Sequence, residues 1–193
     1  MHLSVLIVIN IFFNLYIMRQ LILLLLLIPL FNFAQNNNPV LSISGVEAVV
    51  VDVNNKSANE IYDNLKKWVM KSYRNPDEVI KADIPNEQIR INGYNRGFFQ
   101  GKALSTFDYD VTYMLTLDIK DNKYRLSFVV EDITFDGGTP YLGGTKSWYK
   151  KKDGSVKKGT TLQVNSFNES LKSINNSIYL AATGATKKSN DDW

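Results

Sequence analysis

The sequence predicts an α+β domain in which one face of an antiparallel sheet is covered by two helices. A short apolar segment of strand type precedes a long amphipathic helix, and four further strand-like segments precede a second helix. A run of neighbouring strands with helices at its two ends is typical of α+β domains. Each helix has an apolar stripe that must be buried. We therefore expect both helices to lie on the same face of the sheet.

The first 34 residues have the character of a leader. Arg19 precedes the apolar run Leu21–Phe33, and cleavage after Ala34 would complete a secretory signal peptide, although Asn32 is large for its place three residues before the cut. We predict that translation starts at Met18 and that the protein is exported, to the periplasm or beyond the cell. The alternative is a membrane anchor. The apolar segments on either side of Arg19 are each shorter than the roughly 20 residues that span a bilayer, and joining them would bury a charge.

The composition excludes several classes of chemistry. The chain has no cysteine, and its only histidine, His2, lies in the leader. A disulfide scaffold, lipid attachment through cysteine, Ser–His or Cys–His nucleophile pairs and the usual zinc or copper sites are therefore excluded. We predict no cofactor and no metal site. Beyond residue 34 there are 21 basic and 19 acidic residues, so no overall charge attracts nucleic acid.

The first part of the predicted domain is a strand followed by a helix. Residues 35–45 are rich in asparagine and are predicted to be a linker, and Val46–Val53 reads as a buried strand. Ser57 and Glu60 have the spacing of a capping box, which begins a helix that Pro76 ends. The apolar stripe of this helix consists of Ile61, Tyr62, Leu65, Trp68, Val69 and Tyr73. We expect Trp68 to pack against the hairpin described next.

Four strands follow this helix. The first two are predicted near Glu78–Asp83 and Gln88–Phe99, with glycines that favour a bulge in the second. A hairpin comes next, with Asp121-Asn122 as a two-residue turn. In this register Leu117 lies opposite Leu126, Leu115 opposite Phe128, Tyr113 opposite Val130, Asp118 opposite Arg125 and Thr116 opposite Ser127. Apolar and charged partners are matched together, which specifies the pairing.

The end of the chain is predicted to contain a second hairpin and a closing helix. Residues 146–158 are rich in lysine and include Asp153-Gly154, a strong turn signal. Ser166 and Glu169 repeat the capping-box spacing, and Gly184 is a suitable residue to end the helix. Residues 185–193 are predicted to be a flexible tail. The single domain is thus expected to span residues 46–184.

Three segments resemble a family of secreted bacterial domains of unknown function, DUF4468, which has a TBP-like fold. They are the strand "VEAVVVDV", the helical "SANEIYDNLKKWVMKSYRNPDEVI" and the hairpin "YDVTYMLTLDIKDNKYRLSFVVEDI". The resemblance covers roughly residues 46–134. It implies a TBP-like β-α-β-β-β-β-α order with both helices on one face. It implies no activity, because we know of no catalytic motif in the family.

The exposed face of the sheet is one candidate binding surface. The candidate residues on this face are Thr112, Met114, Thr116, Arg125, Ser127 and Val129. The same pattern also holds three acidic residues and a single arginine, which is opposite to the footprint of a DNA-binding face. We therefore expect no nucleic acid. A flat face with exposed Met114, Val129 and Ile133 would favour a binding role over an enzymatic one.

The lysine-rich segment is a second candidate. The candidate residues are Lys146, Trp148, Tyr149, Lys150, Lys151, Lys152, Lys157 and Lys158. This set is able to contact anionic lipid, polysaccharide or a protein partner, with the aromatic rings supplying apolar area. The alternative interpretation is a solvated hairpin whose lysines discourage edge pairing.

These observations favour a non-enzymatic binding or assembly module of the bacterial cell envelope. Its partner would be a protein or a polysaccharide, and membrane contact would need an uncleaved N-terminus or the lysine-rich hairpin. The alternative function is a carboxylate-dependent hydrolase acting on envelope sugars. A pocket with two carboxylates of separated pKa would indicate the enzyme.

Overall fold

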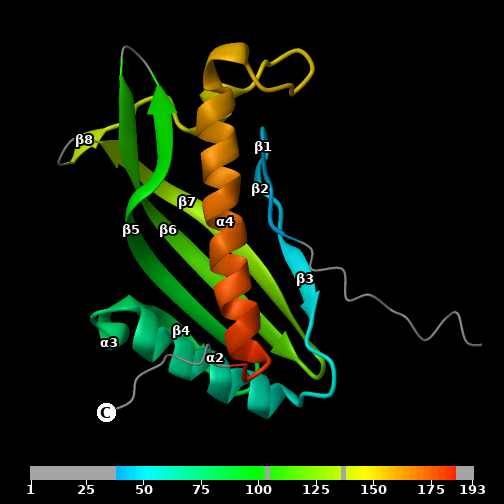
Figure 1. Cartoon of the computed structure of the whole chain (residues 1–193). Coiled ribbons are helices and arrows are strands. Elements are labelled where there is room, and N and C mark those ends of the chain that lie inside the picture. Colours follow the sequence, from blue (N-terminus) through cyan, green and yellow to red (C-terminus); the bar gives the residue numbers. More distant parts are fainter. Residues whose placement is uncertain (1–37, 103–104, 136–137, 186–193) are drawn as a thin grey trace, which may run out of the picture. The chain divides into compact units, whose positions relative to one another are not determined.

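A computed structural model describes residues 38–102, 105–135 and 138–185 (Figure 1). The chain divides into two units, residues 1–35 and 36–193. The predicted leader, its alternative as an anchor, and the predicted tail beyond Ala185 lie outside the described residues. Among the helices described, none is long and apolar enough to cross a membrane.

The described elements include the predicted order of strand, helix, four strands and helix, together with several short elements that were not predicted. The strands are β1 (Leu41–Ser42), β2 (Gly45–Val46), β3 (Val49–Asp52), β4 (Ile80–Ile84), β5 (Gln88–Lys102), β6 (Thr106–Lys120), β7 (Lys123–Phe135) and β8 (Thr139–Pro140). The helices are α2 (Ala58–Ser72), α3 (Pro76–Val79) and α4 (Thr161–Ala182), with short 3-10 turns η2 (Thr145–Trp148) and η3 (Lys158–Thr160).

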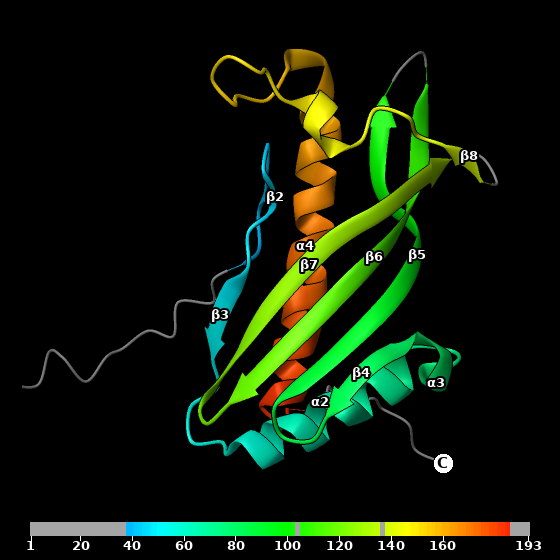
Figure 2. The same ribbon diagram turned by 180° about the vertical axis from the view of Figure 1, so that it is seen from behind.

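The main sheet of the described residues is antiparallel and has the order β3-β7-β6-β5-β4, with β8 added beside β7. Both α2 and α4 lie on one face of it, and the view from behind shows the other face without a helix (Figures 1 and 2). The predicted α+β class, and the placement of both helices on one face, are confirmed.

The β6–β7 hairpin has the predicted register. Leu117 lies opposite Leu126, and Asp118 lies opposite Arg125, whose guanidinium is 2.7 Å from the carboxylate. The register shifts once, because Glu131 is an extra residue between the pairs Tyr113–Val130 and Thr112–Asp132. Such a bulge changes which side chains face inward. Ile133 is consequently only 4% exposed, so its expected place on the open face was wrong.

Helix α2 begins at the predicted capping box. The Glu60 N–H donates to Ser57 Oγ at 3.3 Å, and the Ser57 N–H donates to Glu60 Oε2 at 3.0 Å. Asp121, from the β6–β7 turn, accepts a further bond from the Ala58 N–H at 2.7 Å. The buried stripe is centred on Ile61, Leu65 and Val69, which repeat every four residues.

Helix α4 begins earlier than predicted, at Thr161. The second predicted capping box was wrong, because Ser166 lies inside the helix and its hydroxyl bonds the backbone of the sheet. Its Oγ accepts a hydrogen bond from the Gln100 N–H at 2.9 Å, and the Ser170 hydroxyl donates to the Phe98 carbonyl. At and just beyond the bulge of β5, these serines satisfy backbone groups at an edge that would otherwise be open. Gly184, at φ 76°, follows the end of the helix as predicted.

The predicted linker at residues 35–45 was wrong where the structure describes it. Leu41 is 3% exposed, and β1 pairs with β2. The Leu41 N–H donates to Asn168 Oδ1 at 2.8 Å, and the Tyr149 hydroxyl donates to the Leu41 carbonyl at 2.7 Å. Partners more than 100 residues away in the sequence therefore hold a segment whose composition resembles that of a linker.

Candidate functional site

A groove of about 800 Å³ lies between helices α2 and α4. This volume falls within the usual range of small-molecule sites. The residues that line it are Asn64, Lys67, Trp68, Lys71, Glu169, Lys172, Ser173, Asn176, Ser177, Leu180, Ala181, Gly184 and Ala185. The groove therefore combines three ammonium groups, one carboxylate, hydroxyl and amide groups, and one indole ring.

The helical repeat positions these side chains. In α2 the stripe of Ile61, Leu65 and Val69 faces the sheet, which leaves Lys67, Trp68 and Lys71 on the flanking surface. In α4 the buried positions include Leu171, Asn175 and Ile178, and the intervening residues of the same turns line the groove. The two walls thus come from helices that pack against each other and against one sheet face (Figure 1).

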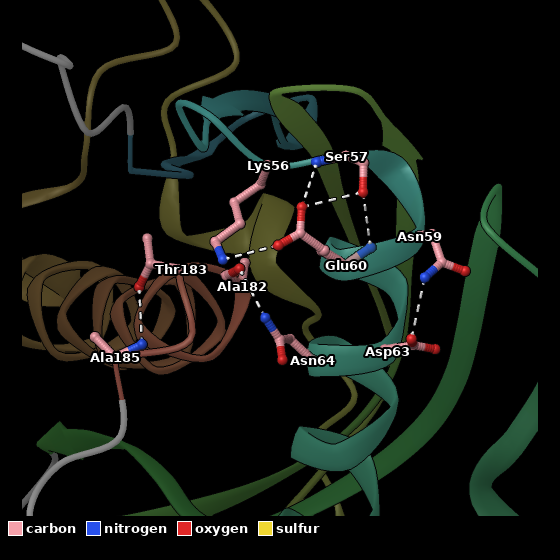
Figure 3. Close-up of polar contacts among 9 residues, drawn as sticks. All are labelled: Lys56, Ser57, Asn59, Glu60, Asp63, Asn64, Ala182, Thr183 and Ala185. Carbon is pink, nitrogen blue, oxygen red and sulfur yellow. Dashed lines mark hydrogen bonds and ion pairs between the residues drawn. The ribbon is translucent and has the colours of Figure 1, made fainter.

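Two hydrogen bonds join the walls of the groove. The Trp68 indole N–H donates to Ser177 Oγ at 2.9 Å. Nearer the end of α4, the Asn64 amide donates to the Ala182 carbonyl at 3.4 Å, close to the capped start of α2 (Figure 3). The first bond corrects the expectation that Trp68 packs in the hairpin layer. Its position in the helix turns it toward α4 rather than toward the sheet.

The Trp68 ring is held on its other side by an aromatic contact. Tyr73 meets it edge to face, with ring centroids 6.0 Å apart. The Tyr73 hydroxyl lies 3.0 Å from that of Tyr113 on β6, and burial raises the pKa of Tyr73. The indole is therefore fixed in orientation before any ligand arrives.

The lysines of α2 divide into two kinds. Lys66 forms an ion pair with Asp83 on β4, and the Tyr62 hydroxyl donates to the same carboxylate at 2.5 Å. That hydrogen bond raises the pKa of Tyr62 to about 12. Lys67 and Lys71 are exposed and make no ion pair within the described residues, so their charges stay available to a ligand. They are the groove's main cationic groups.

On the α4 side the charges partly offset each other. Lys172 lies 3.7 Å from Glu169, and both side chains are at least half exposed. Exposed pairs of this length contribute little energy, so the pair would rearrange readily around a ligand. The groove has three lysines and one glutamate, which makes it an anion-attracting surface.

The candidate residues on the open sheet face are placed as predicted. Thr112, Met114, Thr116, Arg125, Ser127 and Val129 lie on the face opposite the helices. Two of its acidic groups, however, already have partners on the same face. Gln88 and Arg125 both donate to Asp118, and Asn92 donates to Glu131 at 2.7 Å. Burial opposes ionisation of Asp118, but these contacts outweigh it and hold its pKa below the usual value.

The lysine loop, residues 146–158, differs from its prediction. Trp148 is fully buried and Tyr149 is 4% exposed, so their predicted role as a contact surface was wrong. Both rings pack in the hydrophobic core, where Trp148 contacts Phe99 with ring centroids 5.0 Å apart. Instead of a regular hairpin, the loop has a single bridge between Tyr149 and Val156. All six lysines, namely Lys146, Lys150, Lys151, Lys152, Lys157 and Lys158, are exposed.

Sequence reasoning missed the groove between the helices. The alternation of lysine and tryptophan in "LKKWVMK" was the available signal, but it looked the same as the outer side of any amphipathic helix. The α4 wall carried no signal, because serines and asparagines on a helix occur on any solvated surface. Only the crossing of the two helices brings these residues together.

Residues 48–135 match the family described as "Domain of unknown function (DUF4468) with TBP-like fold". A TBP-like protein from Parabacteroides distasonis ATCC 8503 has a similar structure, with TM-score 0.51 and 16% identity over 72% of this chain and 93% of that one. A DUF4468 family protein from Bacteroides ovatus ATCC 8483 gives TM-score 0.52 and 16% identity over 75% and 89%. No curated protein matches the sequence. The predicted resemblance and TBP-like fold are confirmed.

Proposed function

We propose that this chain, which matches the DUF4468 family over residues 48–135, is an exported, non-enzymatic module that binds an anionic oligosaccharide of the cell envelope. The observation that carries the proposal is the groove between α2 and α4, where Lys67, Lys71 and Lys172 surround a fixed Trp68. Export is supported by the leader-like sequence of residues 1–34.

The groove's chemistry favours a sugar that carries acid groups. An indole ring offers a flat apolar surface on which the C–H face of a sugar ring can lie. Serine hydroxyls and asparagine amides both donate and accept hydrogen bonds, as sugar hydroxyls do. The lysines add a charge complement for carboxylate or phosphate substituents. A neutral sugar would leave those charges unused.

A hydrolase acting on envelope sugars is less well supported. Acid–base cleavage of a glycosidic bond needs two carboxyl groups on opposite sides of it. Among the residues that line the groove, Glu169 is the single carboxylate, and Lys172 lies 3.7 Å from it. A binding role is the reading that this composition favours.

The proposal is tested by calorimetric titration with trigalacturonic acid, with maltotriose as the neutral comparison. We expect measurable binding of the acidic sugar, weakening as salt is added. The variant K67S/K71S/K172S should lose at least tenfold in affinity, because it removes the groove's cations. Trp68→Ala should also lose affinity, and Trp68→Phe should retain part of it because the ring is kept.

The matched control is K81S/K120S/K123S, which removes the same charge from exposed residues of β4 and the β6–β7 turn. It should bind as the unaltered protein does. Equal binding of the neutral sugar, or equal weakening by the control, would contradict the proposal. Preference for hexa-aspartate over the acidic sugar would replace it with binding of an acidic protein segment. Thermal unfolding of each variant shows whether the fold is intact.

A further inference from the structure

Positive charge is concentrated in the lysine loop, although the sequence as a whole is nearly neutral. The lysine loop holds six lysines and a single acidic residue, Asp153, which gives a net charge of +5 over 13 residues. The Asp153 carboxylate is engaged within the loop, because its Oδ1 accepts hydrogen bonds from the N–H and hydroxyl of Ser155 at 2.9 and 2.7 Å. These bonds lower its pKa.

The loop is held by the core at its base. Trp148 and Tyr149 are buried, and the Trp148 indole N–H donates to the Tyr141 hydroxyl at 2.9 Å. Backbone hydrogen bonds close the loop itself, from Lys150 N–H to the Ser155 carbonyl at 2.8 Å and from Lys157 N–H to the Trp148 carbonyl at 2.9 Å. The lysines are therefore displayed on a fixed backbone, which reduces the entropy lost on contact.

Two neighbouring features adjoin the loop, and one of them adds to the charge. Helix α4 starts at Thr161, directly after the loop, and its first turn holds no acidic residue, so the positive end of its dipole is not offset there. The β5–β6 hairpin ends at the same end of the molecule as the loop in both views (Figures 1 and 2). This hairpin contributes Phe107, which is 41% exposed, and no net charge, because exposed Lys102 and Asp108 offset each other.

The segment that leads from β8 into the lysine loop carries an exposed apolar side chain. Leu142, four residues before Lys146, is 96% exposed. Isolated exposed apolar residues are common on protein surfaces. A leucine next to a cluster of lysines, however, has the composition of surfaces that lie on anionic bilayers, where the apolar group enters the boundary and the basic groups meet the headgroups.

We propose that the lysine loop docks this protein on the surface of an anionic lipid bilayer. The six lysines contact the headgroups and Leu142 inserts at their boundary. The groove between α2 and α4 lies along the second half of α4, away from the loop. Docking through the loop would therefore leave the proposed sugar site open to solvent.

Sedimentation with vesicles tests the proposal. The protein beginning at Gln35, the predicted mature N-terminus, is mixed with vesicles of phosphatidylcholine alone, or of phosphatidylcholine with phosphatidylglycerol. We expect binding only to the anionic vesicles, decreasing as sodium chloride is added. Each basic residue near such a surface contributes about fivefold to binding. The variant K150S/K151S/K152S should therefore bind on the order of 100-fold more weakly, and Leu142→Ser should weaken binding by a smaller factor.

The control K81S/K120S/K123S lowers the net charge equally but alters the opposite end of the sheet, and it should retain vesicle binding. Equal weakening by this control would mean that net charge alone acts, which overturns the proposal. Absence of binding to anionic vesicles, or binding that inorganic phosphate abolishes at constant ionic strength, would also overturn it. Sugar binding by the K150S/K151S/K152S variant is measured separately, so failure of either proposal can be told apart from failure of the other.

Discussion

At the residue scale, Gly93 shows how closely the sheet and its core side chains approach. A Cβ atom built on Gly93 would lie 2.5 Å from Cζ of Tyr113, which is opposite it on β6. Tyr113 cannot withdraw easily, because its ring stacks on Phe128 at 4.6 Å and its hydroxyl meets that of Tyr73 at 3.0 Å. The glycine is required here by the packing of a neighbour.

We therefore predict that Gly93→Ala lowers the free energy of unfolding by about 1–3 kcal/mol, the usual cost of overfilling a packed core. Urea unfolding followed by circular dichroism measures it. Gly159→Ala is the matched control, because a Cβ there meets nothing within 4 Å. We expect the control to change stability by less than about 0.5 kcal/mol. Similar effects of the two substitutions would refute the packing explanation.

Residue identity alone was a poor guide to the role of the aromatic side chains. Trp148 and Tyr149 lie between lysines in the sequence and were assigned to a contact surface, but the core contains both of them. Trp68 was assigned to the sheet and lies against α4. Trp148 and Tyr149 lie in a polar segment that has no apolar period, so no local pattern predicts which way their side chains point. Trp68 lies beside the buried stripe of α2, where the period does not show whether the sheet or the other helix is its neighbour.

At the scale of elements, the start of α2 was fully predictable because a capping box is a local arrangement. Ser57 and Glu60 satisfy each other's backbone groups without help from the rest of the chain. The β6–β7 hairpin was predictable for a similar reason, since apolar and charged pairs specify one register. The start of α4 was not predictable, because Thr160 makes no side-chain cap.

The capping box predicts the effect of Ser57→Ala. Loss of the hydroxyl leaves the Glu60 N–H without its acceptor, so we expect the free energy of unfolding to fall by about 1 kcal/mol. Ser72→Ala, at the exposed last residue of the same helix, should change it little. Thermal unfolding of both variants provides the measurement. A Ser57 variant as stable as the Ser72 variant would show that the cap is dispensable.

At the scale of the whole molecule, acidic side chains are stabilised in their charged form at several separate places. The carboxyl groups whose pKa is lowered are Glu60, Asp83, Asp110, Asp118 and Asp153. A pKa that is lower in the folded state adds stability above the unfolded value, near 4, and this stability is lost as pH falls through the folded value. The protein should therefore lose stability in acid.

Asp118→Asn isolates one contribution to this acid sensitivity. At pH 7 the variant should be less stable than the unaltered protein, because Arg125 loses its charged partner across the hairpin. The difference should shrink as pH falls below about 4, where the native carboxyl also takes up a proton. Urea unfolding across this range measures it. Asp52→Asn, at an exposed position of β3, is the control, and a pH-independent difference for Asp118→Asn would contradict the linkage.

The sequence by itself determined the α+β class, the capped start of α2, the hairpin register and the family resemblance. Each depends on patterns within a few residues or across one turn, where spacing alone decides which groups meet. Only the tertiary structure decided the groove, the burial of Trp148 and the packing of Leu41. The Trp68–Ser177 bond joins residues 109 positions apart. Such contacts depend on the angle and rotation at which complete helices pack, which no local pattern encodes.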